Sequence, residues 1–171
     1  MRIRDRIVLG AVAGLAANAV KLLTSKTAMR LDWAELHGPL RAAGMLIPPH
    51  KVTQPKGLAV GYLADSIIAI VLGVLTVYML SVTGKDRAVL KGAISGQVFW
   101  TALYGVLGTF GATNVRPELP ETYLTAFVDH TLFGAVAAAV ASKLGHPDLF
   151  DGTTPLVPRR LPLVSGPGPR G

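Results

Sequence analysis

LAVGYLADSIIAIVLGVLTVYMLSV, residues 58–82, carries one charged side chain, Asp65, and shows no charged face at helical spacing. A helix of about 20 mostly apolar residues spans the hydrocarbon core of a bilayer. Three other stretches have the same character, and they occupy residues 7–24, 90–112 and 123–142. We therefore expect an all-α integral membrane protein, with four spans packed as a four-helix bundle within residues 1–145.

The composition also favours a membrane protein over a soluble one. The chain has 171 residues, of which 50% are hydrophobic, and its mean hydropathy is +0.45. A soluble helical bundle would need a charged face on each helix, and residues 98–112 offer none. The formal charge of +7 would suggest nucleic acid in a soluble protein. Here the basic residues lie mainly between the apolar stretches, so membrane orientation explains them and nucleic acid is not an expected partner.

Lys and Arg are more frequent on the side of the membrane that holds the N-terminus. Arg2, Arg4 and Arg6 precede the first span, Lys85 and Arg87 follow the second, and further basic residues follow the fourth. Because basic residues collect on the cytoplasmic side, we expect both termini to be cytoplasmic. The basic residues of the first loop oppose this assignment but are fewer.

The first loop, residues 25–57, is long enough to contain structure of its own. An apolar stripe recurs in it at helical spacing beside charged residues, and it consists of Met29, Trp33, Leu36 and Leu40. This stripe predicts an interfacial helix with its tryptophan at the level of the lipid headgroups. A solvated helical connector explains the stripe equally well. In either case Gly38-Pro39 should break the helix and restart it.

The C-terminal residues 146–171 are rich in proline and glycine, so they can neither continue a helix nor bury an apolar face. We expect a disordered cytoplasmic tail. Its Pro-rich segment 155–162 either belongs to a simple tail or docks in an extended form on a cytoplasmic partner.

Glycine pairs at four-residue spacing mark the expected contacts between spans, because helices in lipid associate through close backbone approach. The pairs are Gly10 and Gly14, Gly57 and Gly61, and Gly92 and Gly96. There are more such faces than one bundle requires. They serve either the packing of this chain alone or, through a spare face, a homo-oligomer or a larger membrane complex.

Polar residues inside the spans are the main functional clues, because each is costly in lipid. Counting residues along each span places one set in the outer half of the membrane, and this polar layer comprises Asn18, Lys21, Asp65, Tyr104, Asp129 and His130. We expect Asp129 to face Lys21 or Asp65. His130 lies about 100° away from Asp129 on the same helix, so we expect it to face Tyr104 or Asn18.

A buried carboxylate in this layer can be stabilised in three ways, and each implies a different function. Pairing with Lys21 would make a structural lock. Protonation beside His130 would make a pH-sensitive group. A hydrated cavity would suggest a path for protons or small ions.

The sequence contains no motif for catalysis or cofactor binding. Ser95 in Gly92-Ala-Ile-Ser-Gly96 stands one place too late for a nucleophile elbow. Neither a phosphate-binding loop nor a paired-histidine zinc helix occurs. We therefore expect a protein that is not an enzyme and that has no cofactor or metal.

Several short motifs resemble the YagU-like family of small bacterial inner-membrane proteins. They are Lys91-Gly92 at the opening of the third span and Leu119-Pro-Glu-Thr-Tyr123 leading into Asp129-His130. With the span order and the Pro-rich first loop, the similarity covers about residues 5–145. The resemblance implies a location in the bacterial cytoplasmic membrane and a link to acid stress. Family members often carry Gly-His in place of Asp129-His130, so only the position of His130 transfers.

Two functional interpretations follow. In the first, a non-enzymatic multi-pass membrane protein uses its buried protonatable layer for proton or small-ion passage, or for sensing acid. In the second, the carboxylates are paired locks, and the chain is a structural or assembly subunit of a membrane complex or homo-oligomer. The sequence names neither a substrate nor a physiological trigger.

Overall fold

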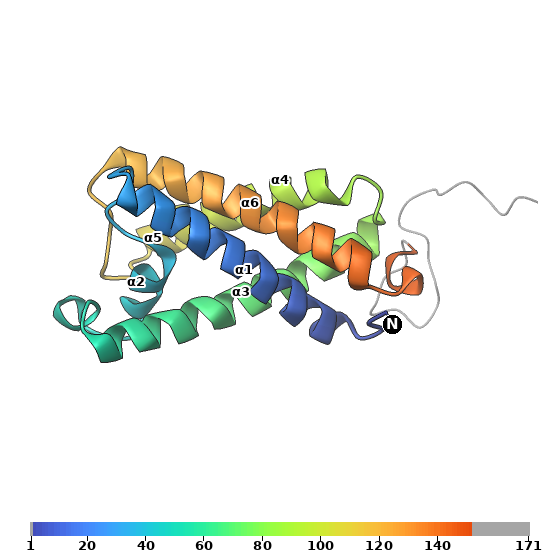
Figure 1. The fold of residues 1–171 in the computed structure, drawn as a ribbon, viewed down its shortest axis with the longest axis horizontal. Coiled ribbons are helices and arrows are strands. Elements are labelled where there is room, and N and C mark those ends of the chain that lie inside the picture. The colour runs from blue at the N-terminus through green and yellow to red at the C-terminus, as the bar shows by residue number, and fades with distance from the viewer. Residues whose placement is uncertain (1, 152–171) are drawn as a thin grey trace, which may run out of the picture.

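The computed structural model describes residues 2–151, and this part of the chain is helical without a β-strand. The all-α prediction is confirmed. Three helices are long and apolar enough to cross a membrane: α1 (Arg6–Arg30), α3 (Pro55–Thr83) and α6 (Pro120–Leu144). Figure 1 shows them running along the length of the molecule. The chain therefore has the helices of a membrane protein.

The third predicted span, residues 90–112, is helical only as far as Thr109 and is not one regular α-helix, and it is not among the three helices that are long and apolar enough to cross a membrane. It consists of α4 (Ala88–Trp100), a π-helical turn η2 (Thr101–Val106) and the short α5 (Leu107–Thr109). Gly105 and Gly108, which are weak helix formers, lie in or beside the π-helical turn. A π-helical turn inside an α-helix often accompanies a functional site, because it redirects side chains locally. Tyr104 lies within this turn.

Two seams of glycine hold the long helices together. On α1, a Cβ at Gly14 would lie 2.2 Å from the backbone oxygen of Ala69 on α3. On α4, a Cβ at Gly92 would lie 2.2 Å from the backbone oxygen of Gly134 on α6. Because α1 also packs along α6, the two helix pairs are in contact with each other. The backbones touch at these crossings, and no larger residue would fit.

All six predicted packing glycines make such contacts within the chain. Gly10 meets Val74, and Gly96 meets the backbone of His130. Gly57 and Gly61, which were expected between spans, instead receive the backbone of the first loop, at Lys51 and Pro39 respectively. The seams therefore serve intrachain packing. None of these six glycines is left to bind a second copy.

The end of the bundle near the N-terminus is closed by apolar packing. Leu9 of α1, Val77 and Leu80 of α3 and Phe150 belong to one buried cluster. Phe150 lies in η3 (Pro147–Phe150), a short 3-10 turn. The predicted disordered tail starts at residue 146, but η3 packs into this core. The rest of that prediction, including the Pro-rich segment and its partner, concerns residues 152–171 and lies outside the described residues.

The first loop is not the single helix that its apolar stripe predicts. Met29 belongs to α1, Trp33 lies in the bend that follows, and Leu40 lies in a separate short helix, α2 (Gly38–Ala43). The break at Gly38-Pro39 is present, with Pro39 in the first turn of α2. Leu40 packs with Ala43 and Val52 in a buried cluster of the loop itself, and this inward packing overrides the helical period. Trp33 is 65% exposed, and its position at lipid headgroups remains a prediction.

The glycine seams generate a stability prediction. Replacing Gly92 by Ala inserts a methyl group into the backbone of α6, and overpacking of this kind costs roughly 1–3 kcal/mol. Gly105→Ala is the matched control on the same span, because the nearest atom to its added Cβ is 3.9 Å away. The measurement is unfolding by sodium dodecyl sulfate, added to protein purified in a mild detergent. Gly92→Ala should be less stable than the wild type, and Gly105→Ala should be as stable as the wild type. Equal stability of the two variants would contradict the close backbone contact between α4 and α6 at Gly92.

Candidate functional site

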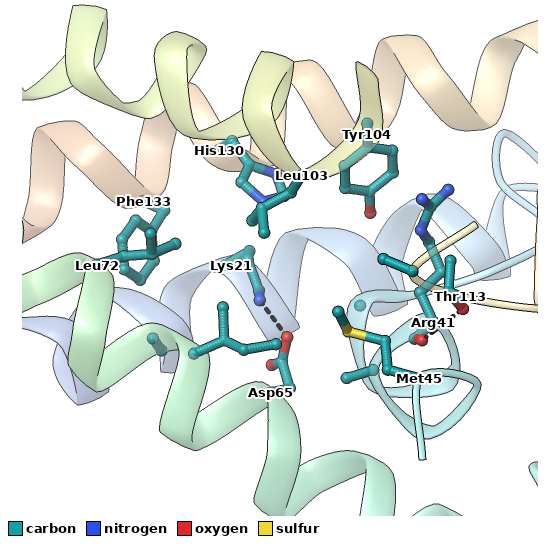
Figure 2. Close-up of a pocket in the computed structure, with 15 residues that line it drawn as sticks. Lys21, Arg41, Met45, Asp65, Leu72, Leu103, Tyr104, Thr113, His130 and Phe133 are labelled. Carbon is teal, nitrogen blue, oxygen red and sulfur yellow. Dashed lines mark hydrogen bonds and ion pairs between the residues drawn. The ribbon is translucent and has the colours of Figure 1, made fainter. Parts of the chain in front are cut away.

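The centre of the candidate site is a buried ion pair between α1 and α3. The Nζ atom of Lys21 lies 2.7 Å from Oδ1 of Asp65, and both side chains are more than nine-tenths buried (Figure 2). Pairing is therefore one way in which this carboxylate is stabilised. The second carboxylate oxygen, Oδ2, is also buried, and among the described residues it has no hydrogen-bond partner. The pair is thus only half satisfied.

Asp129 does not join this pair, contrary to the expectation that it faces Lys21 or Asp65. Its Oδ1 accepts a hydrogen bond of 2.5 Å from Oγ1 of Thr24, which lies about one turn beyond Lys21 on α1. Lys21 is turned toward α3, so α1 presents a hydroxyl rather than an ammonium group to α6. Asp129 lines a different, mainly apolar groove between α1 and α6, beside Leu132. The polar layer therefore splits into two parts.

His130 contacts Tyr104, one of its two expected partners. The ring centroids lie 5.4 Å apart and the rings meet edge to face. Nδ1 of His130 lies 2.8 Å from the backbone oxygen of Ala126. Because a carbonyl only accepts, this contact assigns the proton to Nδ1 and leaves Nε2 as the free ring nitrogen. Asn18 is buried on α1 without a partner for its Oδ1 among the described residues, and it does not line the same cavity.

Sequence reasoning missed Arg41, which α2 carries into the site. Its Cζ atom lies 3.8 Å from the centroid of the Tyr104 ring, so the guanidinium covers the aromatic face. Only 8% of Arg41 is exposed, and its Nη1 atom has no hydrogen-bond partner among the described residues. In the sequence this residue was one of several loop charges. The available signal was weak: a single basic residue inside the short apolar segment 39–43.

These side chains surround a cavity, here called the charged chamber. It is lined by Lys21, Arg41, Asp65, Tyr104 and His130 together with apolar residues such as Phe133. Figure 2 shows the Lys21–Asp65 pair on one side of this space and the side chain of Arg41 beside Tyr104 on the other. The cavity volume is about 60 Å³, and the cavity is partly open. Two cations and one carboxylate line it, so positive charge is in excess while His130 is neutral.

The first loop covers the chamber and is tied down on several sides. The Thr113 hydroxyl donates to the backbone oxygen of Arg41 at 2.9 Å. The Glu35 carboxylate accepts from the backbone N–H groups of Glu118 and Leu119, just before α6. At Gly38 a Cβ would lie 2.8 Å from Oδ1 of Asp65, so glycine lets α2 touch the ion pair. The loop is therefore a lid that reaches the charged groups directly.

The groups at hand can bind a proton or a small charged solute. Within residues 2–151 no three His, Asp or Glu side chains lie close enough to hold a metal ion. The chamber instead offers a carboxylate oxygen, guanidinium donors and an imidazole nitrogen around one space. Such groups change their interactions when one of them gains or loses a proton.

His37, the residue before α2, generates a pH prediction. Burial lowers the pKa of His37 below its usual 6.5, the positive charges of Lys26 and Lys21 lower it further, and Asp65 opposes them. Between the folded pKa and 6.5 the unfolded chain therefore binds more protons. Stability is fully present above pH 6.5 and falls as the pH drops below it.

The measurement is thermal unfolding in detergent from neutral to mildly acidic pH. His37→Gln should flatten the decline below pH 6.5. His50→Gln is the control, because His50 lies exposed in the same loop. If His37→Gln and the wild type lose stability in parallel, His37 is not the responsible group.

The ion pair generates a second prediction. Lys21→Met leaves the Asp65 carboxylate buried without its cation, and removing one partner of a buried pair costs about 3 kcal/mol or more. The double variant Lys21→Met/Asp65→Leu replaces the pair by apolar groups and should recover most of that loss. Unfolding curves of the wild type, both single variants and the double variant give the coupling energy. Additive losses in the double variant would show that the two residues do not act as a pair.

No protein-family model matches this chain, and neither does any curated protein or solved structure.

Proposed function

We propose that the chain is a non-enzymatic multi-pass protein of the bacterial cytoplasmic membrane whose charged chamber binds protons and thereby senses acid. In this proposal α4, η2 and α5 form the fourth span of a four-helix bundle, and both termini are cytoplasmic. The distribution of Lys and Arg supports this orientation. The resemblance to YagU-like proteins supports the location and the link to acid stress.

The observation that carries the proposal is the half-satisfied state of the ion pair. A purely structural lock is expected to satisfy its buried polar atoms, because each unsatisfied one costs free energy. Here Oδ2 of Asp65 and Nη1 of Arg41 are both buried without partners among the described residues, and both residues line one cavity. A proton on Asp65 would cancel its attraction to Lys21. The lid above the pair would then lose a fixed contact.

Acid sensing fits the packing better than open passage does. Between the chamber and the N-terminal end of the bundle lie two buried apolar clusters, one of which contains Ala17, Ala69 and Phe133. The glycine seams bring backbones into contact at the same level, for example Gly14 against Ala69. A proton that enters the chamber in this conformation meets dense apolar packing beyond it. Proton binding from one side of the membrane therefore explains this packing more simply than a continuous proton path does.

The second candidate is a structural or assembly subunit. The observation in its favour is that both buried carboxylates join helices: Asp65 joins α3 to α1, and Asp129 joins α6 to α1. In this interpretation protonation has no role, and neutral amides at both positions would weaken the bundle in the same way. A partner complex would then bind elsewhere than at the six packing glycines, which the chain itself uses.

Infrared difference spectra of the protein in lipid, taken between neutral and acidic pH, distinguish the two functions. The wild type should show a carboxylic-acid C=O band at acid pH that Asp65→Asn removes. Asp129→Asn makes the same chemical change outside the chamber and should keep that band. Proton flux into liposomes should stay at the background level, since the chamber is closed on one side. A difference spectrum that Asp65→Asn leaves unchanged would refute the proposal and favour the structural subunit.

A further inference from the structure

A second cavity adjoins the charged chamber and shares two of its residues. This cavity, here called the arginine pocket, has a volume of about 160 Å³ and is lined by Arg41, Tyr104, Gly108, Thr109, Arg116 and Tyr123. It lies where α5 and the segment before α6 meet α2. None of the described residues that line it is acidic. Two arginines thus face one space without a carboxylate.

Both guanidinium groups converge on the same backbone position. Nη2 of Arg116 donates to the backbone oxygen of Gly108 at 3.0 Å. Nη2 of Arg41 lies 4.0 Å from where a Cβ on Gly108 would stand. Like charges brought together in this way repel. An anion between them would remove this repulsion.

Arg41 has a donor atom, Nη1, that no residue in the described part of the chain uses. The ring of Tyr104 covers one face of its guanidinium but leaves the N–H groups on its edge free. Nη1 is buried and has no hydrogen-bond partner among the described residues, although only 8% of Arg41 is exposed. A buried donor of this kind normally has an acceptor. The position of the pocket beside it shows where that acceptor can enter.

We propose that the arginine pocket binds a small oxyanion of the phosphate class between Arg41 and Arg116. Guanidinium groups bind such anions through paired N–H donors along one edge, which is the edge that Arg41 leaves free. Thr109 and Tyr123 line the same space, but their hydroxyl groups already donate to the backbone oxygens of Gly105 and Pro117, so the guanidinium groups supply the donors. Because the pocket lies at one end of the helices, the phosphate comes either from a lipid headgroup or from free phosphate. This site shares Arg41 with the charged chamber, but it does not include Asp65.

The test uses the full chain and two phosphate sources. In a non-ionic detergent without phosphate, inorganic phosphate is titrated while the thermal midpoint is recorded. In a second arm, nanodiscs of phosphatidylcholine with or without phosphatidylglycerol are compared, and lipid retained by the protein is identified by native mass spectrometry. The variants are Arg41→Gln and Arg116→Gln. Arg30→Gln is the control, because Arg30 is an exposed arginine at the end of α1 and does not line the pocket.

The wild type and Arg30→Gln should bind one of the two probes, and each pocket variant should bind it at least about tenfold more weakly. Stabilisation by inorganic phosphate identifies a free anion, and retention of phosphatidylglycerol alone identifies a lipid headgroup. Arg116→Gln keeps the test decisive if Arg41→Gln does not fold, because Arg116 is exposed. Absence of binding by the wild type in both arms, or equal binding by Arg116→Gln and Arg30→Gln, would overturn the proposal.

Discussion

Backbone contact at the glycine seams is the constraint on which the rest of the structure depends. Helices in lipid gain nothing from excluding water, so they associate where their backbones can approach closely. Gly14 on α1 and Gly92 on α4 fix two such crossings, each against the backbone of its partner helix. At the end away from the N-terminus, α2 and α5 lie among the long helices (Figure 1). The seams thus leave that end of the bundle open for other elements to fill.

Polar backbone and charged side chains fill the end of the bundle away from the N-terminus. These groups need partners, which explains the cluster of hydrogen bonds around the first loop. Irregular backbone at membrane depth is tolerated only where it is buried in protein or lines a cavity. Thr113 and Glu35 accordingly bind backbone groups of Arg41, Glu118 and Leu119. Lys21 pairs with the carboxylate of Asp65, and the guanidinium of Arg41 lies on the aromatic face of Tyr104. The chain itself supplies the polar surroundings that lipid lacks.

The sequence predicts the three long apolar helices and the helix contacts of Gly10, Gly14, Gly92 and Gly96, because both depend on local composition and spacing. It places Gly57 and Gly61 wrongly, since they contact the first loop. It predicts the interior of the site less well. The Lys21–Asp65 pair was among the alternatives, but Asp129 was placed with it, since depth along a helix says little about which neighbour each face meets. Arg41 was missed because its burial depends on the inward fold of residues 31–47. That fold is set by contacts with Gly61 and Thr113, far away in the sequence.

Arg41 links the two cavities, because it lines both the charged chamber and the arginine pocket. A proton on Asp65 removes a negative charge from the chamber and leaves Arg41 with less compensation. An anion bound to Arg41 on its other side then becomes more favourable. Linkage requires the converse, so that a bound anion favours protonation of Asp65 by the same factor. Phosphate-class anion and proton would therefore bind with positive cooperativity across a single guanidinium group. The shared arginine is the physical connection between the lid, the charged chamber and the arginine pocket.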